Sequence, residues 1–384
     1  MGEPDINLDG TDRWLLDAIQ SEFPLGERPY RSLGERLGIS ENEVMDRIRR
    51  HRGSGLIRQI SAIFDSAALG YRSALFAFQV GQSEIEAAAE IVNAHPGVSH
   101  NYERGHAFNL WFTLTAPPPS DPRAHGAALA ALARVERWLY LPAIRLFKIG
   151  VYLPMSASGP SDEAANPRRA ALGALRDGTE ENPEAGSVPG GEAREAPVRE
   201  EAGTMGIPLR AERQAVLALQ EDLPLEIEPF RHRAEEFGLS PTHLLDLAQK
   251  LLQSGKMRRF AAILRHQRAG RRHNVMSVWE VPESRAEEAG AAMARFREVS
   301  HCYQRPTSPG WPWSHYAMIH ARSEDEGLGV VRGIADATGL DRYELLPTVR
   351  EFKKVRIRYF TGGIAKWEAQ HVSRAMSGKL GPER

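Results

Sequence analysis

The spacing of apolar residues predicts three short helices at the start of the chain. Residues 11–23 read TDRWLLDAIQSEF, where apolar side chains recur every three to four positions, as on one face of a helix. Residues 31–38 and 41–52 continue this pattern on either side of a glycine-containing turn. Ser40 and Glu43 match a capping box at the start of the last of these helices. Three short helices with such a turn predict a helix-turn-helix head.

The pattern then changes to an alternation of strands and helices. The expected order is strand 73–80, helix 83–95, strand 98–104, strand 108–115, helix 121–138 and strand 144–153. This βαββαβ order is that of a ferredoxin-like domain. The predicted fold class is therefore α+β, with a helix-turn-helix head followed by a ferredoxin-like body.

The whole unit occurs twice. In the heads, the two copies align with a shift of 200 residues; in the bodies, SHNYER (99–104) matches SHCYQR (300–305) with a shift of 201. Near the end of each body, residues 141–148 match residues 346–353 with a shift of 205. Three matches in the same order indicate an internal duplication. We therefore expect two tandem units that pair with each other as a pseudo-dimer.

A stretch rich in Pro, Gly, Glu and Ala separates the copies, and it contains no aromatic residue from Ser156 to Pro229. Such a composition predicts a flexible tether. The expected organisation is a helix-turn-helix domain 1–62, a ferredoxin-like domain 63–156, a linker 157–206, a second helix-turn-helix domain 207–262, a second ferredoxin-like domain 263–362 and a C-terminal tail 363–384.

Composition narrows the class of protein. The 384 residues carry a formal net charge of −1 and one cysteine, Cys302, which excludes disulfides within the chain and cysteine-rich metal sites. No apolar run reaches the roughly 18 residues of a membrane span, and the polar, acidic start lacks the features of a signal peptide. We expect a cytoplasmic protein without a membrane partner and without a metal site of its own.

The helix-turn-helix heads raise the question of DNA binding. Residues 41–52 hold four arginines against three acidic residues, and residues 241–252 hold one lysine against one aspartate. A helix that reads a DNA groove usually carries a clear basic excess. We therefore expect no DNA partner and assign these helices a packing or dimerisation role.

The repeated SHxYxR segment carries the strongest candidate chemistry. Because alternate residues share one face of a strand, His100, Tyr102 and Arg104 should lie in one row. The second copy repeats this row as His301, Tyr303 and Arg305. One such row could be an ordinary polar sheet surface, but its retention in both copies favours a functional role.

Basic residues also gather before the first strand of each body. Arg58 lies there in copy one, and a denser block that includes Arg258 and Arg259 lies there in copy two. This block is either a solvated face or a clamp for a polyanionic small molecule, since guanidinium groups bind carboxylates in a bidentate manner. No phosphate-binding glycine loop or Rossmann fingerprint is present.

A helix-turn-helix followed by βαββαβ resembles the plan of the Lrp/AsnC family. The phrases GLIRQISAIF, SHNYERGHAFNLWFTL and LPAIRLFKIGVYL, with their copy-two counterparts, resemble the siroheme decarboxylase branch of that family, the NirD/NirL and Ahb type. Copy one looks NirD-like and copy two NirL-like, so the chain resembles a fusion of the two subunits. The resemblance covers both units and leaves out the linker and the ends.

The resemblance implies conversion of siroheme to 12,18-didecarboxysiroheme and two CO2, in heme d1 or alternative heme biosynthesis. Eight carboxylates on siroheme would account for the arginines, and a histidine would donate the proton that each new methyl group needs. The conjugated ring itself can hold the electrons left by CO2. No cofactor is then expected beyond the iron of the siroheme substrate.

By motif position, the candidate catalytic residues are His100, His106, Tyr102, His301 and Tyr303. The candidate substrate-binding residues are Arg58, Arg104, Arg258, Arg259, Arg305, His315, Trp111 and Trp311. Among them, His315 is a further candidate as a substitute donor or an axial ligand.

Two other classes of function stay open at this point. One is an Lrp/AsnC-type transcription regulator that binds DNA, and the other is a tetrapyrrole-binding protein without catalysis. Besides siroheme as the small-molecule partner, the resemblance leaves open a homodimer or an association with NirG- or NirH-like proteins.

Overall fold

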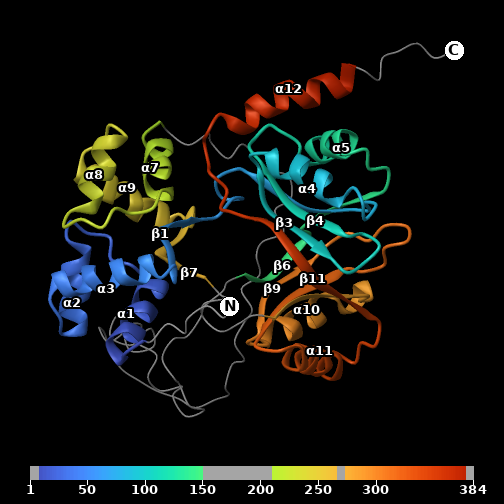
Figure 1. Cartoon of the computed structure of the whole chain (residues 1–384), viewed down its shortest axis with the longest axis horizontal. Coiled ribbons are helices and arrows are strands. Elements are labelled where there is room, and N and C mark those ends of the chain that lie inside the picture. The colour runs from blue at the N-terminus through green and yellow to red at the C-terminus, as the bar shows by residue number, and fades with distance from the viewer. Residues whose placement is uncertain (1–7, 150–209, 266–272, 378–384) are drawn as a thin grey trace, which may run out of the picture.

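The computed structural model describes residues 8–149, 210–265 and 273–377 (Figure 1). The linker expected over 157–206 lies outside these residues. Two helical heads lie together on one side of the molecule, and a sheet body with helices on its outer faces lies on the other. None of the described helices is long and apolar enough to cross a membrane.

The two heads share one apolar core. The first consists of α1 (Gly10–Ser21), α2 (Pro29–Leu37), α3 (Glu41–Gly53) and strand β1 (Ile57–Phe64). The second consists of α7 (Arg210–Gln220), α8 (Pro229–Glu236), α9 (Pro241–Gln253) and strand β7 (Met257–Leu264). β1 and β7 pair in antiparallel fashion, and Phe23 of one head contacts Phe260 of the other with ring centroids 5.8 Å apart. The heads therefore pack on each other, in the dimerisation role expected for them.

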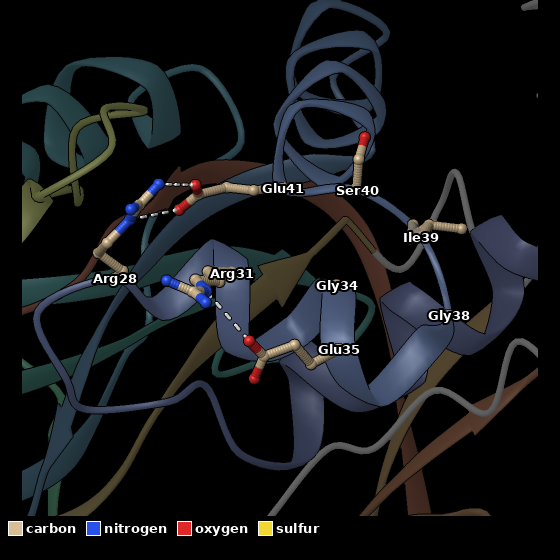
Figure 2. Close-up of a pocket in the computed structure, with 8 residues that line it drawn as sticks. All are labelled: Arg28, Arg31, Gly34, Glu35, Gly38, Ile39, Ser40 and Glu41. Carbon is tan, nitrogen blue, oxygen red and sulfur yellow. Dashed lines mark hydrogen bonds and ion pairs between the residues drawn. The ribbon is translucent and has the colours of Figure 1, made fainter.

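Ion pairs between neighbouring side chains surround the helix-turn-helix turn of the first head. Figure 2 shows a surface depression of about 450 Å³ there, in which Arg28 points to Glu41 and Arg31 to Glu35. Ser40 caps α3 by accepting a hydrogen bond from the Glu43 backbone N–H at 3.1 Å. Both arginines of the depression are thus neutralised by carboxylates, which does not favour binding of a DNA backbone at this turn.

Each body contains a four-stranded antiparallel sheet with two helices on one face. The first body consists of β2 (Arg72–Phe78), α4 (Ile85–Ala94), β3 (Val98–Arg104), β4 (Leu110–Ala116), α5 (Pro122–Leu132) and β5 (Trp138–Pro142). The second consists of β8 (His273–Trp279), α10 (Ala286–Arg295), β9 (Val299–Gln304), β10 (His315–Ala321), α11 (Glu324–Thr338) and the first half of β11 (Tyr343–Lys354). Both sheets have the ferredoxin-like order, in which the first strand lies between the third and the fourth.

The end of each unit leaves its own sheet and joins the other one. Strand β6 (Arg145–Ile149) of the first unit pairs with β9 of the second, and the second half of β11 pairs with β3 of the first. The result is one sheet of nine strands in the order β5-β2-β4-β3-β11-β8-β10-β9-β6. The pairing of the two halves is therefore built into the backbone.

Helix α12 (Gly363–Ser377) continues the chain beyond β11, where the pattern suggested only a tail. It packs on α5 through Trp367, whose ring stacks on His125 with centroids 5.3 Å apart. His125 in turn lies 2.9 Å from His95, between ring nitrogens Nδ1 and Nε2. These contacts fix the end of the chain to the first body (Figure 1).

Three expectations about elements were wrong. The segments of β1 and β7 were given no strand, so the boundaries expected after residues 62 and 262 fall inside these paired strands. The helix expected over 121–138 ends at Leu132, because Trp138 already belongs to β5. The strand expected at 144–153 was assigned to its own unit, whereas β6 pairs with the other half.

One glycine tests the packing between the halves. A Cβ at Gly290 of α10 would lie 2.2 Å from the ring of Phe147, which β6 contributes from the other half. We expect Gly290→Ala to lower the free energy of unfolding by about 1–3 kcal/mol through overpacking. Gly329→Ala on α11 is the matched control, since its Cβ would meet nothing within 4 Å, and it should stabilise by up to about 1 kcal/mol. Urea unfolding of the full chain measures both; equal effects of the two substitutions would contradict the packing argument.

Candidate functional site

A cavity of about 820 Å³ lies between the two halves of the nine-stranded sheet, where it is also lined by β1 of the heads. Its walls come from both halves. One half contributes His100, Tyr102 and Arg104 of β3. The other half contributes His301 and Tyr303 of β9 and Arg305, which directly follows that strand. The two rows that the repeated motif predicted therefore line a single cavity.

The two rows have nearly the same internal geometry. The ring centroids of His100 and Tyr102 are 6.1 Å apart, and those of His301 and Tyr303 are 6.4 Å apart. The guanidinium carbon of each arginine lies over the neighbouring tyrosine ring, 5.5 Å from the centroid of Tyr102 and 4.7 Å from that of Tyr303. This alternation along a strand keeps imidazole, phenol and guanidinium groups on one face.

A serine before each histidine holds the ring. Ser99 Oγ lies 2.9 Å from His100 Nδ1, and Ser300 Oγ lies 2.8 Å from His301 Nδ1. Ser300 Oγ also donates to the carbonyl oxygen of Met318 at 3.3 Å. In each row the serine hydroxyl thus fixes the orientation of the imidazole ring through Nδ1.

Burial and nearby positive charges keep both histidines neutral. Burial, followed by the charges of Lys354, His301 and Arg58, lowers the pKa of His100 to about 4. Burial, followed by the charges of Arg258, Arg305 and Lys354, lowers the pKa of His301 to about 4. A carboxylate bound beside either ring would act in the opposite direction and favour the imidazolium.

The arginine of each row reaches into the other half. Arg104 Nη1 donates to the carbonyl oxygen of Leu346 at 2.8 Å, and Arg305 Nη1 donates to that of Leu141 at 2.5 Å. Burial lowers the pKa of Arg104 to about 10. Within the described residues, the Nε atom of each arginine has no hydrogen-bond partner. Both rows thus present a buried guanidinium with an unused donor.

Residues 354–359 form a further wall that the sequence did not point to. Lys354, Arg356 and Arg358 alternate there, and each lines the cavity. Arg356 donates to Ser61 Oγ and to the carbonyl oxygen of Ala62, both at 2.8 Å, and burial lowers its pKa to about 10. The alternation of basic residues in KKVRIRY was the available signal.

The structure does not bring His106 or His315 to the cavity. His106 lies 3.2 Å from Glu344, between Nε2 and Oε2, and its ring contacts Trp311. His315 is buried beneath α10, where its Nε2 lies 2.9 Å from the carbonyl oxygen of Ala286. Strand alternation explains the position of His315, because its neighbour Tyr316 lines the cavity and His315 faces the opposite side.

The remaining predicted residues divide between the wall and its surroundings. Arg58 and Trp111 line the cavity. Trp311 lies behind the wall and donates to Tyr316 Oη at 2.6 Å. Arg258 forms an ion pair with Asp65 at 2.9 Å. Arg259 lies near Arg356, whose pKa is lowered mainly by burial and then by the charges of Arg58 and Arg259. Among the residues that the structure describes, no group of His, Cys, Asp and Glu could hold a metal ion.

Comparison with known proteins shows where this architecture recurs. The model of the siroheme decarboxylase NirDL-like HTH domain matches residues 12–58 and 212–258, and that of the AsnC-like ligand binding domain matches residues 68–148 and 268–353. A siroheme decarboxylase of Hydrogenobacter thermophilus is 38% identical over 360 residues, which cover 94% of this chain and 98% of that protein. This chain belongs to the siroheme decarboxylase family. The family includes the siroheme decarboxylase NirDL subunit of Paracoccus denitrificans, which is 32% identical over 349 residues, covering 89% of this chain and 93% of that protein.

Solved structures of siroheme decarboxylases have the same fold. The crystal structure of the siroheme decarboxylase NirDL superimposes with a TM-score of 0.69 at 33% identity, covering 96% of this chain and 100% of that one. A second structure, NirDL in co-complex with an iron-uroporphyrin III analogue, gives a TM-score of 0.68 at 33% identity and covers 95% of this chain and 99% of that one. The Lrp/AsnC-like, two-unit architecture expected from the sequence is therefore confirmed.

The neutral histidines make a prediction about pH. Because the folded-state pKa values of about 4 lie below the unfolded value of about 6.5, protons bind the unfolded chain more readily. The free energy of unfolding should then fall as the pH decreases from about 6.5 to about 4. The double variant His100→Gln/His301→Gln should lose less stability over that window in denaturation titrations. The buried His95 and His125 are present in both proteins, so an identical decline in both would contradict these pKa shifts.

Proposed function

We propose that this chain is a siroheme decarboxylase that removes two acetate carboxylates from siroheme as CO2 and gives 12,18-didecarboxysiroheme. The observation that carries this proposal is the single cavity with one His-x-Tyr-x-Arg row from each half. The proposal is supported by the similarity of this chain to siroheme decarboxylases that carry the same two-unit architecture in one polypeptide.

The charges of the cavity suit a polycarboxylate. Six lysine and arginine side chains line it, against the two carboxylates of Glu221 and Asp222. Both carboxylates already form ion pairs, Glu221 with Arg358 and Asp222 with Arg52 at 3.0 Å. Between the charges, Trp111, Met276 and Met318 supply apolar surface. An extended apolar ring with carboxylates on its rim would satisfy both kinds of wall.

The proposed reaction requires a proton donor and no general base. The bond between the acetate methylene and the carboxylate carbon breaks, CO2 leaves, and the electron pair passes into the conjugated ring. One proton then converts the methylene into a methyl group, so each loss of CO2 consumes one proton and each siroheme consumes two. A histidine that becomes protonated when a carboxylate binds beside it is a suitable donor, and the guanidinium groups hold the other carboxylates.

We also propose that no cofactor is needed beyond the iron of the substrate, because the ring itself takes up the electrons. A cytoplasmic location remains part of the proposal, as does heme d1 or alternative heme biosynthesis as its setting. A homodimer, or an association with NirG- or NirH-like proteins, stays a prediction.

The first test uses the substrate itself. We expect anaerobic incubation of the purified chain with siroheme to give a product that has lost the mass of two CO2, as measured by mass spectrometry. An intermediate that has lost one CO2 should precede it. Siroheme that is bound but unchanged would instead support the non-catalytic tetrapyrrole-binding protein and contradict the enzyme.

The second test concerns the donors. We expect His301→Ala to lower turnover by about 100-fold or more, the usual contribution of a positioned acid, and His100→Ala to lower turnover at subsaturating siroheme. His106→Ala is the matched control, because His106 lies outside the cavity lining and should leave most of the turnover intact. Circular dichroism checks the fold of all three variants. Loss of turnover with His106→Ala alone would overturn this assignment of donors.

A further inference from the structure

The two rows are flanked by equivalent strands. β6 passes beside β9, and the second half of β11 passes beside β3, in the same register. Lys148 and Lys353 occupy matching positions and make equivalent hydrogen bonds. Lys148 Nζ donates to the carbonyl oxygen of Phe296 at 2.7 Å, and Lys353 Nζ donates to that of Asn93 at 2.6 Å. These contacts at the ends of α10 and α4 show that the two flanking strands are structural counterparts.

The residues that neighbour the rows themselves differ in kind. Ile149 is the cross-strand partner of His301, and Leu146 is that of Tyr303. At the matching places of the other half, Lys354 is the partner of His100 and Glu351 is that of Tyr102. Ile149 and Lys354 both line the cavity. One row therefore has apolar neighbours and the other has charged ones.

The charged neighbours act on their row. Burial, and then the charge and the hydrogen bond of Glu351, raise the pKa of the Tyr102 hydroxyl. Lys354 heads the charges that lower the pKa of His100, and it is joined there by Arg58, which donates to the Lys354 carbonyl oxygen at 2.8 Å. Its counterpart in the other half, Arg258, is paired with Asp65 at 2.9 Å. Lys354 Nζ also lies 3.9 Å from Glu351 Oε2, so the His100 side carries an ion pair where the His301 side has Leu146 and Ile149.

This difference matters for a decarboxylation. An ammonium group beside a carboxylate stabilises the reactant more than a transition state in which that negative charge moves into the ring. An apolar neighbour offers the carboxylate no such stabilisation and so favours its loss. The same ammonium is well suited to hold a carboxylate that must stay.

We infer that the two rows divide the reaction. The acetate that loses CO2 is held at His301 and Tyr303 beside Ile149, and the His100 row with Lys354 anchors a carboxylate that is retained during that step. His301 gives its proton to the methylene carbon and is reprotonated from solvent, while Ile149 and Lys354 act as positioning residues. This inference rests on the proposed function and specifies which half of the cavity does the chemistry.

The test separates binding from the chemical step. Siroheme titration followed by absorbance gives Kd, and anaerobic single turnover at saturation gives the rate constant for the first loss of CO2. We expect Ile149→Lys to lower that rate constant about tenfold or more while Kd stays the same or falls, since the added ammonium stabilises the bound carboxylate. Lys354→Ile should have its larger effect on Kd, raising it about tenfold. The conservative variants Ile149→Val and Lys354→Arg should restore each parameter to within about threefold of the native value.

Substitution of the two histidines tests the same division between the catalytic row and the anchoring row. His301→Gln should lose mainly the rate constant, and His100→Gln mainly affinity. The opposite assignment of effects, or equal effects of Ile149→Lys and Lys354→Ile on both parameters, would overturn the inference. A native protein that leaves siroheme unchanged refutes the proposed function, and the inference with it. A native protein that decarboxylates siroheme while Ile149→Lys and Lys354→Ile have equal effects refutes the inference alone.

Discussion

The main-chain hydrogen bonds between β11 and β3, and between β6 and β9, are the interaction on which the rest of the structure depends. Without them each four-stranded sheet would end in an open edge next to its own SHxYxR strand. With them, each row is covered by a strand of the other half, and the inner faces of the two sheets enclose a shared core and the cavity. The reach of Arg104 and Arg305 to carbonyl oxygens across the halves follows from the same exchange.

Much of the fold and the essential part of the site followed from the sequence. The repeat predicted two like units, and strand alternation predicted that His100, Tyr102 and Arg104 share a face. Which strand pairs with which is a different matter. Apolar periodicity shows which face of a strand is buried, but it does not show which strand lies beside it. The exchange of β6 and β11 therefore could not be predicted from the sequence. The same limit left the pairing of β1 with β7 unseen.

The differences between the predicted site residues and the cavity lining have a similar origin. His106 and His315 were chosen for their closeness in sequence to the SHxYxR motif, but one lies beyond the end of β3 and the other on the outer face of β10. Lys354, Arg356 and Arg358 were overlooked because they lie at and beyond the end of β11, outside both the SHxYxR motif and the basic block before each body. Sequence spacing predicts neighbours within an element, whereas these residues meet the rows only through tertiary packing.

The exchange of closing strands also bears on how the protein is produced. Where a row and its covering strand come from different polypeptides, unequal synthesis leaves the surplus subunit with an uncovered sheet edge. A chain that carries both copies delivers row and cover from one translation event, in a one-to-one ratio that no difference in expression or degradation can disturb.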